Sequence, residues 1–157
     1  MKVLLAIDGS PHSDAAVAEV ARRPWPSGTV VKILTVIHSV VPLMIDPALI
    51  MAAVHVDQLA EQRRLASTFL DAAVKHIQAD AAGVEVTTKV LEGSPKDVIV
   101  DEAREWDADL IVVGSHGYGR LQRMVLGSVA GAVVASAPCS VQVVRDRHAF
   151  GRAETAA

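Results

Sequence analysis

The sequence predicts a single α/β domain with an open, doubly wound, five-stranded parallel sheet that carries helices on both faces. The chain has 157 residues, which is the size of one ordinary domain. Hydrophobic residues make up 51% of it and aromatic residues only 3%, so aliphatic side chains must form the core, as in strands buried on both faces. Strand-length apolar runs alternate with segments of helical periodicity. That alternation predicts parallel strands joined by right-handed crossovers.

The sequence between the first two predicted strands predicts a helix with clear start signals. Val3 to Ile7 is a short apolar run, typical of a buried strand. Ser10 is expected to be the N-cap of the next helix, with Pro11 at its first position, and the helix should run to Pro24. Thr29 to Ile37 is rich in Val and Ile, which predicts the second strand.

The middle of the chain combines an irregular segment with a long helix. Ser39 to Ala48 carries two prolines and is expected to be irregular. Apolar residues then recur at helical spacing, which predicts a helix that begins near Pro47 or Leu59 and continues to Ala81. Val84 to Leu91 alternates between apolar and polar residues and is predicted to be the third strand.

The last third of the chain supplies two more helices and two more strands. Ser94-Pro95-Lys96-Asp97 is a variant of the capping box and predicts a helix through about Glu105. Asp109 to Val113 is the fourth predicted strand. A helix is expected from at least Ser128, followed by a fifth strand at Ser140 to Val144. We expect one domain over residues 1–146 and a disordered tail over residues 147–157.

Charge and cysteine content argue against several classes of protein. Lys and Arg together number 15 and Asp and Glu 18, so the formal charge of −3 leaves no basic excess for nucleic acid. The single cysteine, Cys139, excludes an intramolecular disulfide and a site built from several thiolates, and it favours a reducing compartment. We therefore expect no nucleic-acid partner and no structural zinc.

The apolar segments of the chain do not predict membrane insertion. The apolar run before Asp8 is too short for the core of a signal peptide. The stretch from Val40 to Val56 is interrupted by prolines and polar residues and falls short of the roughly 20 residues of a spanning helix. We expect a cytoplasmic protein with no membrane partner. The mean hydropathy of +0.34 predicts apolar surface that an oligomer would cover.

A glycine-rich pattern after the fourth strand predicts an anion site. Gly114-Ser115-His116-Gly117 is followed, after nine residues, by Gly127-Ser128 at an expected helix start. Two glycines allow backbone N–H groups to approach a phosphate, and the helix start adds donors and a hydroxyl. We call Gly114, Gly117, Gly127 and Ser128 the glycine cradle. The pattern is neither a Walker A loop nor a dinucleotide fingerprint. On spacing alone, a purely structural interpretation explains the pattern as well as a phosphate site does. In that interpretation the glycines at 114, 117 and 119 form turns and the glycine at 127 allows close packing.

Four stretches of the sequence resemble the universal stress protein family. They are Ile7-Asp8-Gly9-Ser10, Ile111-Val112-Val113-Gly114-Ser115-His116-Gly117, Leu126-Gly127-Ser128-Val129 and Pro138-Cys139-Ser140-Val141. The resemblance covers residues 2–145, and the glycine spacing is similar to the signature of that family's ATP-binding branch. It implies an adenine-nucleotide alpha-hydrolase-like sheet with strand order 3-2-1-4-5, and ATP or another adenine nucleotide as the ligand.

The resemblance also implies a role for individual residues. The phosphates would lie at the glycine cradle, with the backbone of Val129 as a further donor. Asp8 would face the ribose, or a Mg²⁺ or Mn²⁺ ion held by the phosphates. Adenine would lie against Ala6 and Ile7, contact the backbone of Val36, and rest on Val113. Relatives often carry His where this chain has Thr35, so that wall departs from the family pattern.

Several residues of the predicted site allow a second interpretation. An isolated acid such as Asp8 more often caps the next helix, although Ser10 already serves that purpose. A hydrolase role for Ser115 beside His116 is disfavoured, because we expect that adjacent residues in a tight loop do not form a Ser–His hydrogen bond. The six histidines lack metal-binding spacing and are expected mostly at the surface. Arg120 and Arg123 could contact a terminal phosphate or form a solvated face.

We therefore expect an ATP-binding universal stress protein that acts as a regulatory or sensing module in stress response, with an unidentified protein partner. Nucleotide occupancy would change the dimer or the segment 39–56. A slow Mg-dependent ATPase is an alternative, although the sequence offers no general base besides Asp8. A nucleotide-free structural or chaperone-like dimer is another. The resemblance implies a homodimer formed through the strand at residues 140–145, expected at a sheet edge. The sequence leaves the preferred adenine nucleotide open.

Overall fold

The computed structural model describes residues 1–38, 50–117 and 126–146, and the side chains of residues 50–58 are not described. One parallel sheet of five strands runs through the domain in the order β3-β2-β1-β4-β5. The strands are β1 (Lys2–Ala6), β2 (Val30–Ile37), β3 (Glu85–Glu92), β4 (Leu110–Gly114) and β5 (Ser140–Val144). The predicted fold class and strand order are therefore confirmed.

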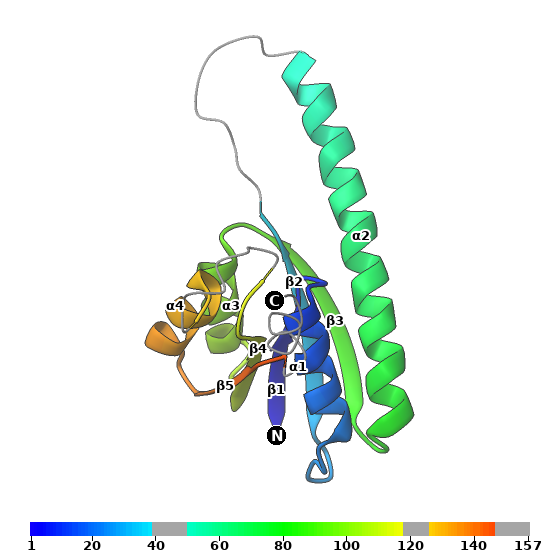
Figure 1. Ribbon diagram of the computed structural model, residues 1–157, viewed down its shortest axis with the longest axis vertical. Helices are drawn as coiled ribbons and strands as arrows, with labels where there is room; N and C mark the ends of the chain where they lie inside the picture. Colours follow the sequence, from blue (N-terminus) through cyan, green and yellow to red (C-terminus); the bar gives the residue numbers. More distant parts are fainter. Residues whose placement is uncertain (39–49, 118–125, 147–157) are drawn as a thin grey trace, which may run out of the picture.

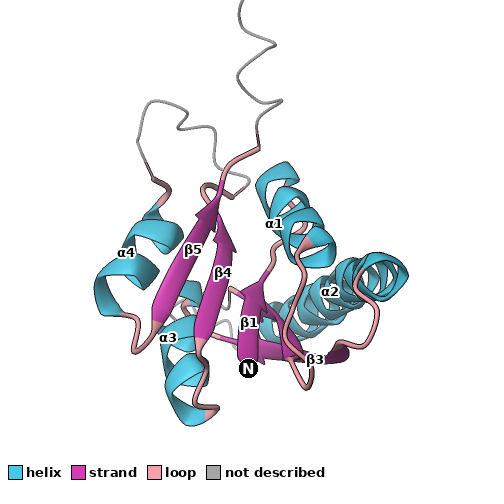
Figure 2. Cartoon of the chain, turned by 90° about the horizontal axis from the view of Figure 1, so that it is seen from below, coloured by secondary structure: helices cyan, strands magenta, loops and turns pink. Residues whose placement is uncertain are grey.

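Four helices cover the two faces of the sheet. They are α1 (Pro11–Arg22), α2 (Ile50–Asp80), α3 (Pro95–Glu105) and α4 (Ser128–Ser136). Figure 2 shows α1 and α2 on one face and α3 and α4 on the other. The helix α2 is much longer than the sheet is wide, and its first half projects beyond the rest of the described domain (Figure 1).

The core consists of two aliphatic layers separated by the sheet. Alternate residues of each central strand point to opposite faces, so that Leu5 contributes to the α1/α2 layer while Leu4 contributes to the α3/α4 layer. Both side chains are fully buried. A sheet that is covered on both sides explains why the central strands read as continuous apolar runs rather than as alternating ones.

Local signals account for most of the element boundaries. Ser10 caps α1, because its Oγ accepts a hydrogen bond from the Ser13 N–H at 3.3 Å. The helix ends at Arg22 rather than at Pro24, since the residue before a proline avoids helical backbone and Arg23 is extended. The start of α2 at Ile50 falls between the two predicted starts.

The predicted cap of α3 is confirmed in its position, but its predicted side-chain hydrogen bond is not formed. Ser94 is the N-cap residue of α3, but its side chain makes no capping hydrogen bond. Its carbonyl oxygen accepts from the N–H groups of Asp97 and Val98 instead, at 3.0 and 2.9 Å. The Ser94 hydroxyl and the Asp97 carboxylate therefore do not form the reciprocal pair of a capping box, although the helix begins where the sequence predicts.

The strand order fixes where a ligand can bind. From β1 the chain proceeds outward through β2 to β3, and it then crosses back to β4 and β5 on the other side of β1. Connections leave the carboxyl ends of β1 and β4 toward opposite faces, which opens a crevice between these two strand ends. The glycine-rich segment follows β4 directly, so the topology brings it to this crevice.

Several predicted segments fall outside the described residues. They are the irregular segment over residues 39–48, the two arginines Arg120 and Arg123, and the tail over residues 147–157. Among the residues that are described, no helix combines the length and the apolar character that crossing a bilayer requires.

Candidate functional site

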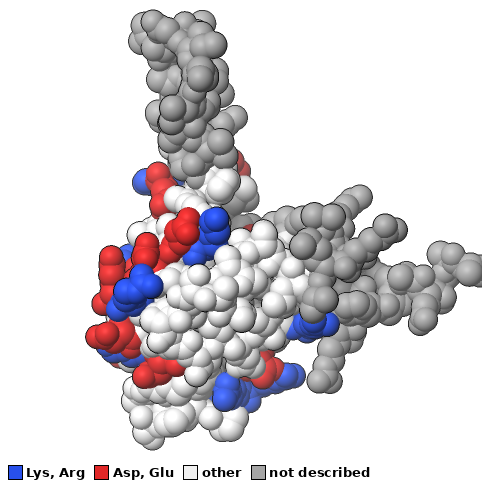
Figure 3. Space-filling view, turned by 90° about the vertical axis from the view of Figure 1, so that its left-hand side faces the viewer, with Lys and Arg blue, Asp and Glu red and all other residues white. Residues whose placement is uncertain are grey.

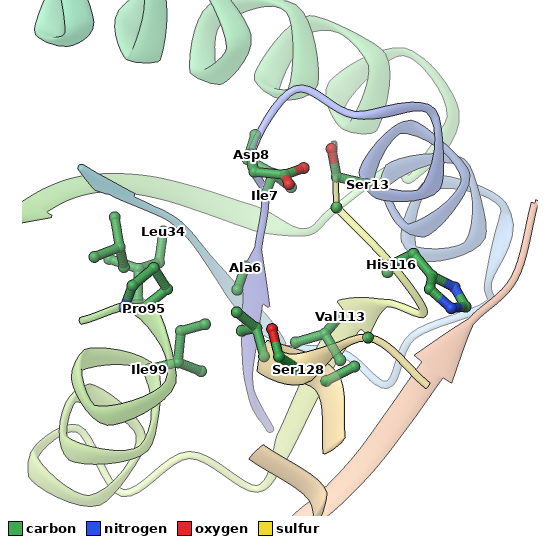
Figure 4. A pocket seen from close by; sticks show the side chains of 16 residues that line it. Ala6, Ile7, Asp8, Ser13, Leu34, Pro95, Ile99, Val113, His116 and Ser128 are labelled. Atoms are coloured by element: carbon green, nitrogen blue, oxygen red, sulfur yellow. The ribbon is translucent and has the colours of Figure 1, made fainter. Parts of the chain in front are cut away.

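A cavity of about 280 Å³ opens at the carboxyl ends of β1 and β4 (Figure 4). Its volume is close to the lower end of the range for small-molecule sites. The structure brings together every residue that was predicted for the site. The cavity is lined by Ala6, Ile7, Asp8, Val36, Val113, Gly114, Gly117, Gly127, Ser128 and Val129.

The cavity has an apolar end and a polar end. Leu34, Pro95 and Ile99 lie together on one side, as Figure 4 shows, and Asp8 and His116 lie toward the other. The apolar end is formed where β2 and the first turns of α3 face each other. A flat, weakly polar group would fit the apolar end, and a charged group the polar end.

Sequence reasoning missed the residues that close the apolar end. Leu34 could have been found, because it lies two residues before Val36 and so points to the same face of β2. Pro95 and Ile99 come from the start of α3, which follows β3. Because β3 is two strands away from β1, only the assembled sheet brings α3 to this cavity.

The first turns of three helices reach the cavity. Ser13 of α1, Pro95 of α3 and Ser128 of α4 all line it. A helix N-terminus carries a partial positive charge and N–H groups that favour an anion, and the starts of α1 and α4 contribute these outside the apolar end, whereas Pro95 of α3 has no N–H to donate. Among the described lining residues there is no Lys or Arg, and Asp8 is the one carboxylate. Within the described lining, positive potential therefore comes from backbone groups.

Asp8 faces the glycine cradle. Its Oδ1 accepts a hydrogen bond from the Ser10 N–H at 3.0 Å, which stabilises the turn between β1 and α1. Its Oδ2 lies where it would be 2.6 Å from a Cβ added at Gly117. Ser10 caps α1, as predicted, so Asp8 is not needed as the cap and presents its carboxylate to the cavity.

The glycines of the cradle lack a side chain for different structural reasons. A Cβ at Gly114 would lie 2.7 Å from the backbone carbon of His12, so this glycine is required for packing against α1. At Gly127 a Cβ would meet the carbonyl oxygen of Ser115 at 3.1 Å. The positive-φ glycines of the described chain do not include Gly114, Gly117 or Gly127, so none of these three is needed for a left-handed backbone. Gly119 lies outside the described residues.

The structure corrects the expectation for Ser115 beside His116, and among the described histidines it leaves His38 and His76 exposed. The Oγ of Ser115 lies 3.2 Å from Nδ1 of His116, so the adjacent residues do form a hydrogen bond. It also lies 3.4 Å from Nδ1 of His12. The two rings are 5.3 Å apart between centroids, and both histidines are half-buried rather than at the surface. The fold brings His12 of α1 to the β4 loop, which sequence spacing cannot reveal.

Neither Cys139 nor a cluster of metal-ligating side chains forms a second site in the part of the chain that the structure describes. Cys139 is partly buried among the apolar residues on the α3/α4 side, and burial raises the pKa of its thiol, with the charge of Asp109 acting in the same direction. The structure therefore gives Cys139 a packing environment. Within the described residues, no group of three or more His, Cys, Asp or Glu side chains is arranged to hold a metal ion.

The fold and the cavity define a class: an open doubly wound α/β domain with a ligand crevice at the switch point of its sheet. The model of the universal stress protein family matches residues 1–145, and the chain belongs to that family.

Curated relatives and solved structures agree with this membership. A putative universal stress protein of Staphylococcus saprophyticus is 32% identical over 91% of this chain and 82% of its own length. One from Synechocystis is 38% identical over 57% of this chain and 56% of its own length.

Two solved structures share the fold over nearly their whole length. UspA of Lactobacillus plantarum superposes with a TM-score of 0.77 at 26% identity, covering 92% of this chain and 97% of that one. The universal stress protein of Archaeoglobus fulgidus in complex with dAMP has a TM-score of 0.61 at 26% identity, with 92% and 97% covered.

Proposed function

We propose that this protein binds an adenine nucleotide, with ATP as the expected ligand, in the cavity between the carboxyl ends of β1 and β4. The observation that carries this proposal is the division of one cavity into an apolar end, formed by β2 and the start of α3, and a polar end that carries Asp8, His116 and the start of α4. Adenine suits the first and phosphate the second. The complex of the Archaeoglobus fulgidus relative with dAMP supports the same class of ligand.

The base would lie between β2 and α3, where no charged side chain lines the cavity in the described part of the chain. Ala6, Val36 and Ile99 would contact its faces, and backbone groups would contact its edge. Burial of an aromatic base against aliphatic side chains favours binding, but it does not distinguish ATP from ADP or AMP. The length of the phosphate chain must therefore be recognised at the glycine cradle.

The phosphates would accept hydrogen bonds from backbone N–H groups at the start of α4. The negative Asp8 carboxylate would then lie close to the negative phosphates. The carboxylate and the phosphates would repel each other unless a cation lies between them. A Mg²⁺ or Mn²⁺ ion bound by one carboxylate and phosphate oxygens is a common arrangement, and Asp8 fits it. Asp8 would alternatively accept a hydrogen bond from the ribose.

We assign the protein a regulatory or sensing role in stress response, with nucleotide occupancy as the signal to a protein partner. Binding rather than turnover is proposed, because Asp8 cannot both hold a metal or the ribose and activate water at the far phosphate.

We further propose that the protein is a homodimer formed through β5. This strand is at the edge of the sheet, where its outer backbone groups need a partner. The adjacent helix α4 contains no charged residue, and Val134 on it is 48% exposed. The side of the molecule where α4 lies carries a wide area without charged side chains (Figure 3). A second copy would cover this surface by an isologous contact.

The direct test is to purify the protein, denature it and identify any released nucleotide by absorbance and chromatography. An adenine nucleotide at a stoichiometric level is the expected result. Protein without bound nucleotide would then be titrated calorimetrically with ATP. A chain that carries no nucleotide and shows no heat of binding with ATP, ADP or AMP would contradict the proposal.

Glycine variants locate the site. Gly117→Val places side-chain atoms against the Asp8 carboxylate, and Gly127→Val presses a Cβ on the backbone of Ser115 and His116 behind the cradle. Neither position needs a left-handed backbone, so we expect a folded protein that does not bind ATP. Gly131→Ala in α4 is the matched control, since a Cβ there meets no atom within 4 Å. Wild-type affinity in both valine variants, with an unchanged circular dichroism spectrum, would exclude this cavity as the binding site.

A further inference from the structure

Ser115 joins the two parts of the glycine cradle to each other and to the edge strand. Its carbonyl oxygen accepts a hydrogen bond from the Gly127 N–H at 2.8 Å, which holds the second part of the cradle beside the first. Its own N–H donates to the carbonyl oxygen of Val144 at 2.7 Å. The backbone of this one residue therefore connects β4, α4 and β5.

The side chain of Ser115 makes a second set of contacts behind the cradle. The residue is only 1% exposed, and its Oγ lies 3.2 Å from Nδ1 of His116 and 3.4 Å from Nδ1 of His12. Of these three residues, only His116 lines the cavity. The hydroxyl thus lies between a residue of the cavity wall and a residue of α1 that does not touch the cavity.

The direction of these hydrogen bonds follows from the neighbours of His12. The N–H of Asp146 donates to Nδ1 of His12 at 3.4 Å, so this nitrogen is an acceptor. The Ser115 hydroxyl has a single proton, and His12 Nδ1 can receive it only as an acceptor. When Ser115 donates to Nδ1 of His12, its Oγ is the acceptor for Nδ1–H of His116, an assignment of protons that fits the three heavy-atom distances. One consistent chain results, from His116 through Ser115 to His12.

We propose that Ser115 is a positioning residue of the glycine cradle, acting through His12 and His116, and this rests on the proposed function above. Its hydroxyl anchors the loop after β4 to the first turn of α1, which also packs against Gly114. An anchored loop holds the phosphate-binding backbone groups in place before the ligand arrives, so less ordering is required on binding. We expect the effect to be confined to phosphate recognition, because none of the three hydrogen-bonded residues His116, Ser115 and His12 lies at the apolar end of the cavity.

Two pairs of variants test this proposal by comparing ATP with adenosine. Ser115→Ala removes the hydroxyl, and Ser136→Ala at the exposed end of α4 is its control. His12→Leu removes the acceptor on α1, whereas His12→Asn keeps an acceptor atom near the position of Nδ1. We expect Ser115→Ala and His12→Leu to weaken ATP binding about tenfold while adenosine binding changes less than twofold. His12→Asn should restore most of the ATP affinity.

Comparing ATP with adenosine distinguishes a positioning role of Ser115 at the phosphates from a general destabilisation of the binding site. An equal loss of ATP and adenosine affinity, or no loss of either, would overturn the positioning role while the nucleotide site stands. If Ser115→Ala does not fold, the two His12 variants decide, since equal ATP affinity in both would also overturn it. A wild-type protein that binds neither ATP nor adenosine would refute the proposed function itself, and the positioning role with it.

Discussion

Asp8 uses its two carboxylate oxygens for different purposes. One oxygen accepts from the Ser10 N–H and stabilises the β1–α1 turn, and the other faces Gly117 across the cavity. A structural role and a binding role therefore coexist in one side chain. Substitutions at this position have to separate the two roles, and the chain allows this because Asn keeps the acceptor that the turn needs.

We predict that Asp8→Ala weakens ATP binding roughly tenfold or more in the presence of Mg²⁺. If Asp8 holds a metal, Asp8→Asn should be as weak as Asp8→Ala, and the loss should shrink when Mg²⁺ and Mn²⁺ are omitted from all samples. If Asp8 binds the ribose, Asp8→Asn should bind nearly like the wild type. Calorimetric titration gives these affinities, and unchanged binding in Asp8→Ala would leave Asp8 with its turn role alone.

Thr35 carries the buried polar side-chain atom that lacks a hydrogen-bond partner in the described part of the chain. Its Oγ1 is inaccessible within β2, and the residue is 5% exposed. Thr35→Val should raise the free energy of unfolding by about 1 kcal/mol, because the desolvation cost of the hydroxyl disappears. Thr29 provides the contrast, since its buried hydroxyl donates to the carbonyl oxygen of Pro26 at 2.7 Å.

Thr29→Val should therefore lower the free energy of unfolding by about 1 kcal/mol. Urea denaturation of the two variants beside the wild type measures both changes. Destabilisation by Thr35→Val of the same size as that by Thr29→Val would mean that the Thr35 hydroxyl has a partner in solution.

At the scale of elements, β5 has one paired and one open backbone edge. The carbonyl oxygen of Val144 bonds to β4 through Ser115, and in a parallel pair every second residue bonds to the same neighbour. The N–H of Val143 therefore points away from β4, toward the open edge. The side chains of Val141 and Val143 pack on the α3/α4 side of the sheet, and Val144 packs on the α1/α2 side.

Val143→Pro should shift the protein from dimer to monomer. Proline removes an N–H that the internal sheet does not use, so the pairing of β4 with β5 should persist while pairing with a second copy is lost. Gln142→Pro is a useful contrast, because it removes an N–H on the β4 side and should destabilise the domain itself. Light scattering reports the mass, and a monomeric wild type at micromolar concentration would contradict an interface on β5.

At the scale of the whole molecule, a buried charge network ties α3 to two strands. Glu102 is 3% exposed and accepts hydrogen bonds from Lys32 of β2 at 2.8 Å and from Lys89 of β3 at 2.6 Å. The Nζ of Lys32 also lies 4.1 Å from the ring centre of Trp106. Burial raises the pKa of Glu102, but the two lysine hydrogen bonds outweigh burial and hold this pKa below its ordinary value.

Stability should consequently depend on pH through Glu102. A carboxyl whose pKa is lowered by folding stabilises the native state above its unfolded pKa, and this contribution is lost as the pH falls through the folded pKa. Glu102→Gln should cost about 2 to 3 kcal/mol at pH 7, because it leaves two lysines without their acceptor charge. The difference from the wild type should shrink below pH 4.5, the ordinary pKa of the group.

Urea denaturation between neutral and acidic pH measures this dependence. Glu105→Gln, on the exposed side of the same helix, is the control and should change the free energy of unfolding by less than about 0.5 kcal/mol. A constant difference between Glu102→Gln and the wild type at all pH values would contradict the assigned role of the network.

The sequence by itself determined the fold class and, through its family resemblance, the strand order and part of the cavity lining. These features depend on local signals: apolar runs for the strands, Ser10 and Pro11 for the start of α1, and glycine spacing for the loop after β4. The loops after β1 and β4 could be named because parallel topology brings the carboxyl ends of these strands to one edge, whereas Ala6, Ile7 and Val113 were implied by the family resemblance.

Only the tertiary structure decided how distant residues meet. It brought His12 to Ser115, although 103 positions separate them, and it placed Pro95 and Ile99 at the apolar end of the cavity. It also showed that Gly114 is small because α1 packs against it. The physical reason is that helix packing on a sheet, which depends on side-chain volumes from many elements at once, sets these contacts, whereas local periodicity carries no information about them.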